Sequence, residues 1–125
     1  MPLLTAYSGS KAALAIMTKN IANSLAGHQI RVNALNIGWT DTPAEHDIQK
    51  RVHNKGDDWL EQEESKVPFK RLTKTIDVAK GLAFMCSEES GLMTGSVIDF
   101  DQTVNGWHSY SAYETNILDD SLLGE

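Results

Sequence analysis

The chain has 125 residues, a formal net charge of −6 at pH 7 and 41% hydrophobic residues. This length accommodates one domain at most, and the apolar fraction excludes a chain that is disordered throughout. Four of the six net negative charges lie in residues 107–125, which contain no Lys or Arg and are predicted to form a flexible acidic tail. The rest of the chain carries no basic stripe of the kind that binds phosphate backbones, so no nucleic-acid partner is expected.

Cysteine usage and hydropathy predict a cytoplasmic protein. Cys86 is the single cysteine and ends the apolar run 82–86, which predicts a buried thiol in a reducing compartment. No apolar run reaches the ~20 residues needed to span a membrane, and the first residues do not resemble a secretory signal. We therefore expect no membrane partner.

A long helix is predicted over residues 7–26, because large apolar residues recur at helical spacing along it. These residues are Leu14, Met17, Ile21 and Leu25. Ala12, Ala13 and Ile16 form a second apolar side, so the helix is expected to be covered on two sides. Gly27 follows the last periodic residue and is predicted to end the helix.

Two strands are predicted further along the chain. Residues 30–37 alternate apolar and polar side chains up to Gly38, and residues 96–100 are rich in residues that favour strands. Between them, residues 39–72 carry mixed charges and are predicted to hold one or two short surface helices. Residues 75–87 are predicted to form a further helix, with Thr75 as its N-cap.

The order helix, strand, helices, strand is typical of an α/β fold. Two strands joined by a helical crossover build a parallel sheet that is covered by helices. A two-stranded sheet does not stand alone, since three or more strands are usually needed for independent stability. The sequence therefore predicts the C-terminal part of a doubly wound parallel sheet, with the amino-terminal part missing.

A Tyr and a Lys lie four residues apart at the start of the first helix. Tyr7 and Lys11 share one helix face at this spacing, and a nearby ammonium favours the ionised form of a phenol. That makes the phenol a better acid or base near neutral pH. On these two residues alone, an ordinary surface pair is the alternative.

The surrounding residues resemble the short-chain dehydrogenase/reductase family, in which Tyr, three residues and Lys form the active-site signature. The motif consists of Tyr7, Ser10 and Lys11, followed by Ala12, Ala13 and Leu14. The similarity continues in register through Arg31-Val32-Asn33, Gly38, Thr42, Asp77-Val78-Ala79 and Thr94-Gly95-Ser96-Val97-Ile98. By this resemblance, residues 1–106 are the C-terminal half of a Rossmann-like domain.

The resemblance implies an oxidoreductase that uses NAD or NADP on a small-molecule carbonyl or alcohol substrate. Tyr7 would transfer the proton, and Lys11 would increase the acidity of Tyr7 and bind the nicotinamide ribose. Gly38 would let the backbone approach the cofactor, and the Thr42 hydroxyl would contact its carboxamide or phosphates. An ordinary strand-ending turn at Gly38 and a helix N-cap at Thr42 are the alternatives.

The chain also departs from the family pattern. Ile37 replaces the Pro that commonly precedes Gly38, and no Gly-rich phosphate-binding turn or catalytic Ser upstream of Tyr7 is present. Activity of the chain alone is therefore uncertain, and the alternative is a truncated, non-catalytic remnant that associates through helix 7–26. In the family this helix commonly packs against its twin, so a homo-oligomer is expected.

Other residues are less specific. The resemblance assigns residues 39–72 to the substrate loop, although its three large aromatic residues could simply anchor the surface helices to the core. These aromatic residues are Trp39, Trp59 and Phe69. No metal site is predicted, because the four His residues share no metal-ligand spacing with Cys or carboxylates. They are His28, His46, His53 and His108.

Overall fold

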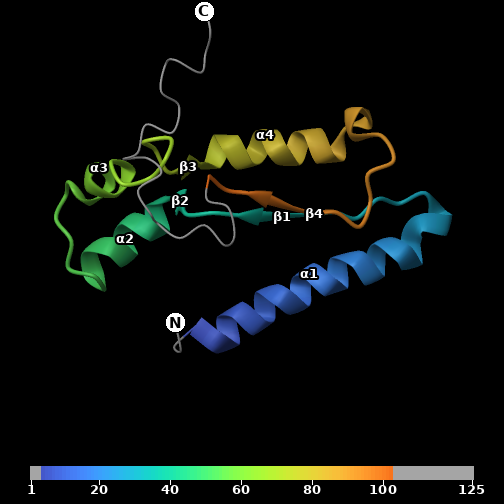
Figure 1. Cartoon of the computed structure of the whole chain (residues 1–125), viewed down its shortest axis with the longest axis horizontal. Coiled ribbons are helices and arrows are strands. Elements are labelled where there is room, and N and C mark those ends of the chain that lie inside the picture. The colour runs from blue at the N-terminus through green and yellow to red at the C-terminus, as the bar shows by residue number, and fades with distance from the viewer. Residues whose placement is uncertain (1–3, 103–125) are drawn as a thin grey trace, which may run out of the picture.

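The computed structural model describes residues 4–102, so the predicted acidic tail lies outside the described residues. Figure 1 shows the arrangement of the elements. In chain order they are α1 (Thr5–Leu25), the 3-10 turn η2 (Ala26–His28), β1 (Ala34–Ile37), β2 (Thr40–Asp41), α2 (Pro43–Arg51), α3 (Trp59–Glu64), β3 (Thr73–Lys74), α4 (Thr75–Cys86), the 3-10 turn η3 (Glu88–Ser90) and β4 (Val97–Phe100).

The central strands β1 and β4 pair in parallel, which confirms the predicted α/β class. Ala34 lies opposite Val97, and Ile37 lies opposite Phe100. Helix α4 runs along one side of this strand pair, and α1 diverges from it on the other side (Figure 1). Gly81 of α4 permits close packing, since a Cβ there would lie 3.2 Å from side-chain atoms of both Leu35 and Phe100.

A second parallel pair, β2 and β3, was not predicted. It joins Thr40 to Thr73 and Asp41 to Lys74. Each strand is two residues long, too short to show the alternation that marks a strand in a sequence. The pair ties both ends of the α2–α3 segment together.

Several element boundaries differ from the predictions. The predicted strand 30–37 is paired only over Ala34–Ile37, because its partner β4 begins at Val97. Gly27 does not end α1 in the left-handed conformation. Helix α1 continues into η2, and Gln29 ends that turn in the left-handed conformation, with φ of 61° and its N–H donating to the carbonyl of Ala26 at 3.0 Å.

The start of α4 is capped by a residue other than the one predicted. Thr75 is the first residue of the helix, and Lys74 occupies the N-cap position. The carboxylate of Asp77 accepts a hydrogen bond from the backbone N–H of Lys74 at 2.9 Å. Asp77 therefore caps the first turn, where a negative charge also favours the helix dipole.

The end of α4 corrects the prediction for Cys86, which is exposed. Adjacent residues on a helix point about 100° apart, so burying Met85 turns Cys86 outward. The Arg31 guanidinium donates to the carbonyls of Met85 and Ser87, each at 2.9 Å. Arg31 thereby satisfies carbonyl groups that the helix end leaves without intrahelical partners.

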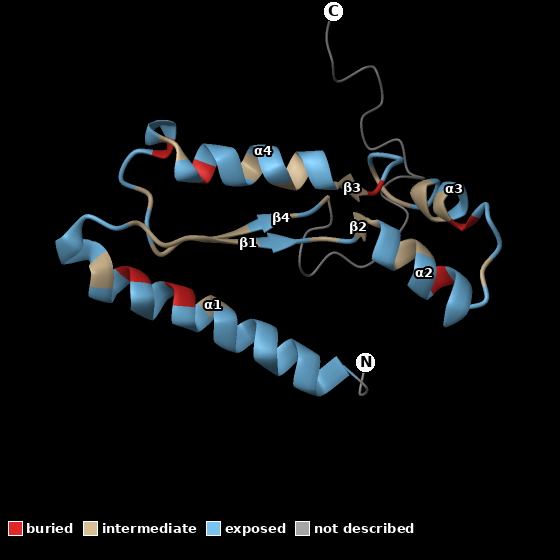
Figure 2. Cartoon of the chain, turned by 180° about the vertical axis from the view of Figure 1, so that it is seen from behind, coloured by how far each residue is buried: buried red, intermediate tan, exposed pale blue. Residues whose placement is uncertain are grey.

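Helix α1 is much less covered than the sequence predicts. Thr18 and Ala22 are its buried residues, and both lie in its second half. Leu14, Ile16 and Met17 are all more than half exposed. Figure 2 shows exposed residues along most of the helix. The expectation of two covered sides is wrong for this chain, because its two-stranded central sheet reaches only part of α1.

Candidate active site

Tyr7 and Lys11 lie side by side in the first turns of α1. The Nζ atom of Lys11 lies 5.4 Å from the centroid of the Tyr7 ring, as the helical spacing predicts. The Ser10 hydroxyl donates to the Tyr7 carbonyl at 2.7 Å, so Ser10 is used within the helix. The ammonium therefore lies over the Tyr7 ring in a cation–π contact.

These two side chains line a groove of about 670 Å³ between α1 and β1. The strand contributes Asn36 and Ile37 to the same groove. Tyr7 is 59% exposed, so the groove is open on the phenol side. It is large enough to hold a small molecule beside the phenol and the ammonium.

Gly38 and Thr42 follow β1 but are not among the groove's lining residues. A Cβ on Gly38 would lie 2.3 Å from the carboxyl carbon of Asp101, so this carboxylate occupies the space that glycine leaves. The Thr42 hydroxyl accepts a hydrogen bond from the backbone N–H of Glu45 at 3.1 Å. Thr42 is thus the N-cap of α2, one of the two roles considered for it.

The family model described as enoyl-(acyl carrier protein) reductase matches residues 1–105. The chain belongs to the short-chain dehydrogenase/reductase family. It is 37% identical over 100 residues to a 3-oxoacyl-[acyl-carrier-protein] reductase of Thermotoga maritima, covering 80% of this chain and 38% of that protein. It is 36% identical over 100 residues to a 4-formylbenzenesulfonate dehydrogenase of Comamonas testosteroni, with 80% and 39% covered.

Solved structures of the short-chain dehydrogenase/reductase family have the same fold. A family member from Francisella tularensis superposes with a TM-score of 0.68 at 38% identity, covering 78% of this chain and 42% of its own. The L-sorbose reductase of Gluconobacter frateurii, solved with NADPH and L-sorbose, gives a TM-score of 0.72 at 28% identity, with 83% and 41% covered. The chain thus spans about two fifths of the length of these relatives.

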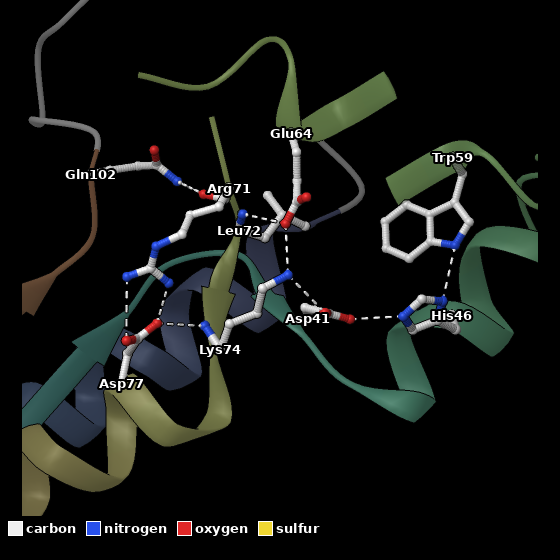
Figure 3. A network of polar contacts seen from close by, with 9 residues as sticks. All are labelled: Asp41, His46, Trp59, Glu64, Arg71, Leu72, Lys74, Asp77 and Gln102. Carbon is white, nitrogen blue, oxygen red and sulfur yellow. Dashed lines mark hydrogen bonds and ion pairs between the residues drawn. The ribbon is translucent and has the colours of Figure 1, made fainter. Parts of the chain in front are cut away.

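In the present chain, the α2–α3 segment and its flanking strands hold a polar network that the sequence did not predict (Figure 3). Nε2 of His46 lies 2.7 Å from a carboxylate oxygen of Asp41, and the indole N–H of Trp59 donates to Nδ1 of His46 at 3.2 Å. Because an indole N–H can only donate, Nδ1 of His46 accepts from Trp59 while Nε2 faces the Asp41 carboxylate. No local signal reveals this network, because its members come from β2, α2, α3, β3 and α4 and from segments between elements.

Lys74 connects the Asp41 carboxylate of this network to the Glu64 carboxylate of α3. Its ammonium lies 2.9 Å from Asp41 and 2.7 Å from Glu64. Hydrogen bonding to Lys74 holds the pKa of Asp41 and that of Glu64 below their ordinary values. Nearby, hydrogen bonding to Arg71 lowers the pKa of Asp77 to about 2. Lys74 therefore neutralises two carboxylates that would otherwise repel each other.

Replacing Lys74 with Met is expected to destabilise the fold at pH 7 by about 1 kcal/mol, because solvent screens this partly exposed pair. Carboxylates with lowered pKa stabilise the native state above their ordinary pKa, and this contribution is lost as the pH falls through the lowered values. Urea unfolding between pH 7 and pH 3 should therefore show a weaker loss of stability in Lys74→Met than in the original chain.

The matched control for this prediction is Lys70→Met, which removes an exposed ammonium that donates to the carbonyl of Ser65 and forms no ion pair among residues 4–102. Its stability should follow the pH dependence of the original chain. Equal pH dependence in the Lys74→Met and Lys70→Met variants would contradict the assigned role of Lys74.

The three aromatic residues of the segment differ in burial. Trp59 is 1% exposed and anchors α3, which was the simpler of the two interpretations. Trp39 is partly exposed, and its indole N–H donates to Glu45 at 2.8 Å. Phe69 is 74% exposed, so it is not buried in the core as Trp59 is.

The described part of the chain lacks a membrane-spanning helix and a cluster of metal-binding side chains. Between residues 4 and 102, no helix is both long and apolar enough to cross a membrane. The same residues contain no group of three or more His, Cys, Asp or Glu side chains that could hold a metal ion. His108 lies outside the described residues.

Proposed function

We propose that the protein carrying this chain is an NAD(P)-dependent oxidoreductase that acts on a carbonyl/alcohol pair. Membership of the short-chain dehydrogenase/reductase family supports this proposal. The observation that carries it is the Lys11 ammonium 5.4 Å from the Tyr7 ring, within a groove open to a small molecule. The NADPH bound to the L-sorbose reductase supports a nicotinamide cofactor without distinguishing NAD from NADP for this chain.

In the proposed mechanism Tyr7 transfers the proton. Its O–H donates to the carbonyl oxygen of the substrate during reduction, and the phenolate accepts the proton from the alcohol in the reverse direction. Lys11 stabilises the phenolate, because its positive charge lies beside the ring. A bound nicotinamide supplies or accepts the hydride.

The residues around Lys11 fit the ribose end of such a cofactor. Among residues 4–102, no side chain or carbonyl accepts a hydrogen bond from the Lys11 ammonium, so its three donors remain for ribose hydroxyls. The sequence contains no Gly-rich turn for the pyrophosphate. We therefore propose that residues 1–106 supply the proton-transfer half of a Rossmann-like domain, and that residues 39–72 border its substrate.

A second candidate is a non-catalytic module that associates through α1. The exposed apolar residues of this helix favour it. In either case we propose that α1 mediates association with another copy and that the protein is cytoplasmic. Size-exclusion chromatography combined with dinucleotide titration distinguishes the candidates, since the remnant would form oligomers without binding the dinucleotide.

The proposed role of Lys11 is tested by replacing it with Met. Loss of the ammonium should weaken dinucleotide binding about tenfold, because the ribose hydroxyls lose a charged hydrogen-bond donor. The measurement is a fluorescence titration with NADH and with NADPH, on this chain joined to the amino-terminal part that its relatives carry.

Lys19→Met is the matched control, since it removes an exposed ammonium from the same helix two turns further on. This variant should bind the dinucleotide as tightly as the original protein does. If Lys11→Met also left the affinity unchanged, the proposed role of Lys11 would be wrong.

A further inference from the structure

The side chain of Gln102, two residues after the end of β4, binds the backbone of a distant turn at two points. Its Oε1 atom accepts a hydrogen bond from the backbone N–H of Phe69 at 2.9 Å, and its Nε2 group donates to the carbonyl of Arg71 at 2.8 Å. Figure 3 shows the second of these bonds. Because the amide oxygen and the amide NH₂ are both used, the orientation of the side chain is defined. Gln102 therefore links the end of the central sheet to the end of the segment 39–72.

Between these two attachment points lies a residue in a costly backbone conformation. Lys70 has φ of 53°, in the left-handed region that residues with a Cβ rarely adopt. Its N–H donates to the carbonyl of Val67 at 3.1 Å, and its ammonium donates to the carbonyl of Ser65 at 2.7 Å. Such a conformation persists only where the surrounding contacts hold it. The two bonds to Gln102 lie directly on either side of Lys70, so they are suited to hold the turn 67–71.

The turn 67–71 borders a pocket at the carboxyl end of β4. Phe69, Arg71 and Gln102 all line this pocket, which has a volume of about 250 Å³. The pocket also includes Phe100, which lies opposite Ile37 of the candidate-site groove. In open parallel sheets, ligands bind outside the carboxyl ends of the strands. The turn thus lies at the end of the sheet where a ligand is expected.

We propose that Gln102 is a positioning residue for the substrate segment, because its amide holds the turn 67–71 closed and so fixes the place of the exposed Phe69 side chain. This inference rests on the proposed function, in which residues 39–72 border the substrate. Gln102 acts on the substrate only through this turn. It therefore influences how tightly the substrate binds and leaves the proton transfer by Tyr7 unchanged.

Replacing Gln102 with Met removes both hydrogen bonds and retains the length of the side chain. The closed turn should then make up about a third of the population, so the substrate KM should rise about threefold while kcat changes little. The assay follows consumption of NADH and of NADPH with benzaldehyde and ethyl acetoacetate, on this chain joined to the amino-terminal part that its relatives carry. In the same protein, ¹⁵N NMR should show the Phe69 amide exchanging with deuterium about tenfold faster or more.

A second substitution separates this role from a general structural one. Glycine adopts a positive φ without the steric cost that a Cβ brings, so Lys70→Gly should restore the KM of Gln102→Met to within about twofold of the original value. Lys70→Ala is the matched control, since it also removes the ammonium but keeps the Cβ, and it should restore nothing. Gln102→Glu keeps the acceptor and loses the donor; it repeats the measurements should the Met variant fail to fold, with shifts of the same sign.

Each result decides one proposal. Unchanged exchange of the Phe69 amide in Gln102→Met, or faster exchange with an unchanged KM, overturns the positioning role of Gln102. Equal effects of Lys70→Gly and Lys70→Ala overturn the role assigned to the left-handed turn. If the original protein consumes neither NADH nor NADPH with a carbonyl substrate, the proposed function is wrong, and exchange of the Phe69 amide alone then decides whether Gln102 holds the turn.

Discussion

Replacing Tyr7 with Phe should lower the rate of hydride transfer by about 10²–10⁴-fold, the usual contribution of a positioned acid or base. The substitution removes only the phenol oxygen, so the ring still contacts Lys11 while the proton donor is lost. The rate is measured as NAD(P)H consumption with a panel of carbonyl substrates. Because the relatives are longer, the assay uses this chain joined to the amino-terminal part that they carry.

Dinucleotide affinity provides the internal control for this experiment. Binding should change little in Tyr7→Phe, since the ammonium of Lys11 is retained. Ser8→Ala alters another residue of the groove and should retain most of the activity. A Tyr7→Phe variant as fast as the original would exclude Tyr7 as the proton donor.

Replacing Trp59 with Ala should destabilise the fold by about 3–5 kcal/mol, the usual cost of truncating a large buried aromatic residue. The indole is 1% exposed and makes an edge contact with the His46 ring, with centroids 4.9 Å apart. Loss of the indole leaves a cavity and removes the N–H group that donates to Nδ1 of His46. Because single domains are stabilised by only about 5–15 kcal/mol, this one substitution should remove a large share of the total stability.

Urea unfolding followed by circular dichroism measures this effect. Phe69→Ala is the matched control, since this aromatic residue of the same segment is 74% exposed and its truncation should cost less than about 0.5 kcal/mol. Similar losses in the Trp59→Ala and Phe69→Ala variants would show that burial of Trp59 does not hold the segment together.

Local interactions explain which parts of the candidate site could be predicted. Tyr7 and Lys11 are four residues apart on one helix, so their proximity follows from helix geometry alone. Local sequence also offered two roles for Thr42, a cofactor contact and a helix N-cap. The structure shows the capping bond, in which the Thr42 hydroxyl accepts from the backbone N–H of Glu45. The catalytic roles of Tyr7 and Lys11 remain predictions.

Long-range contacts explain what could not be predicted. Lys74 and Asp41 are 33 residues apart, and Asn36 and Asp99 are 63 apart. Neither pair leaves a periodic signal, because hydrogen bonds between distant residues depend on strand register. The prediction that Cys86 is buried was wrong for a related reason. The apolar run 82–86 does not indicate which side of α4 packs against the sheet.

The sequence by itself determined the order of the longer helices and the two central strands, the α/β class that this order implies, and the Tyr7–Lys11 pair, since these follow from patterns of residues close along the chain. Only the tertiary structure decided how far β1 is paired, which part of α1 is covered and which polar groups meet across strands. These features depend on the position of distant segments, and burial and hydrogen bonding are settled where those segments meet.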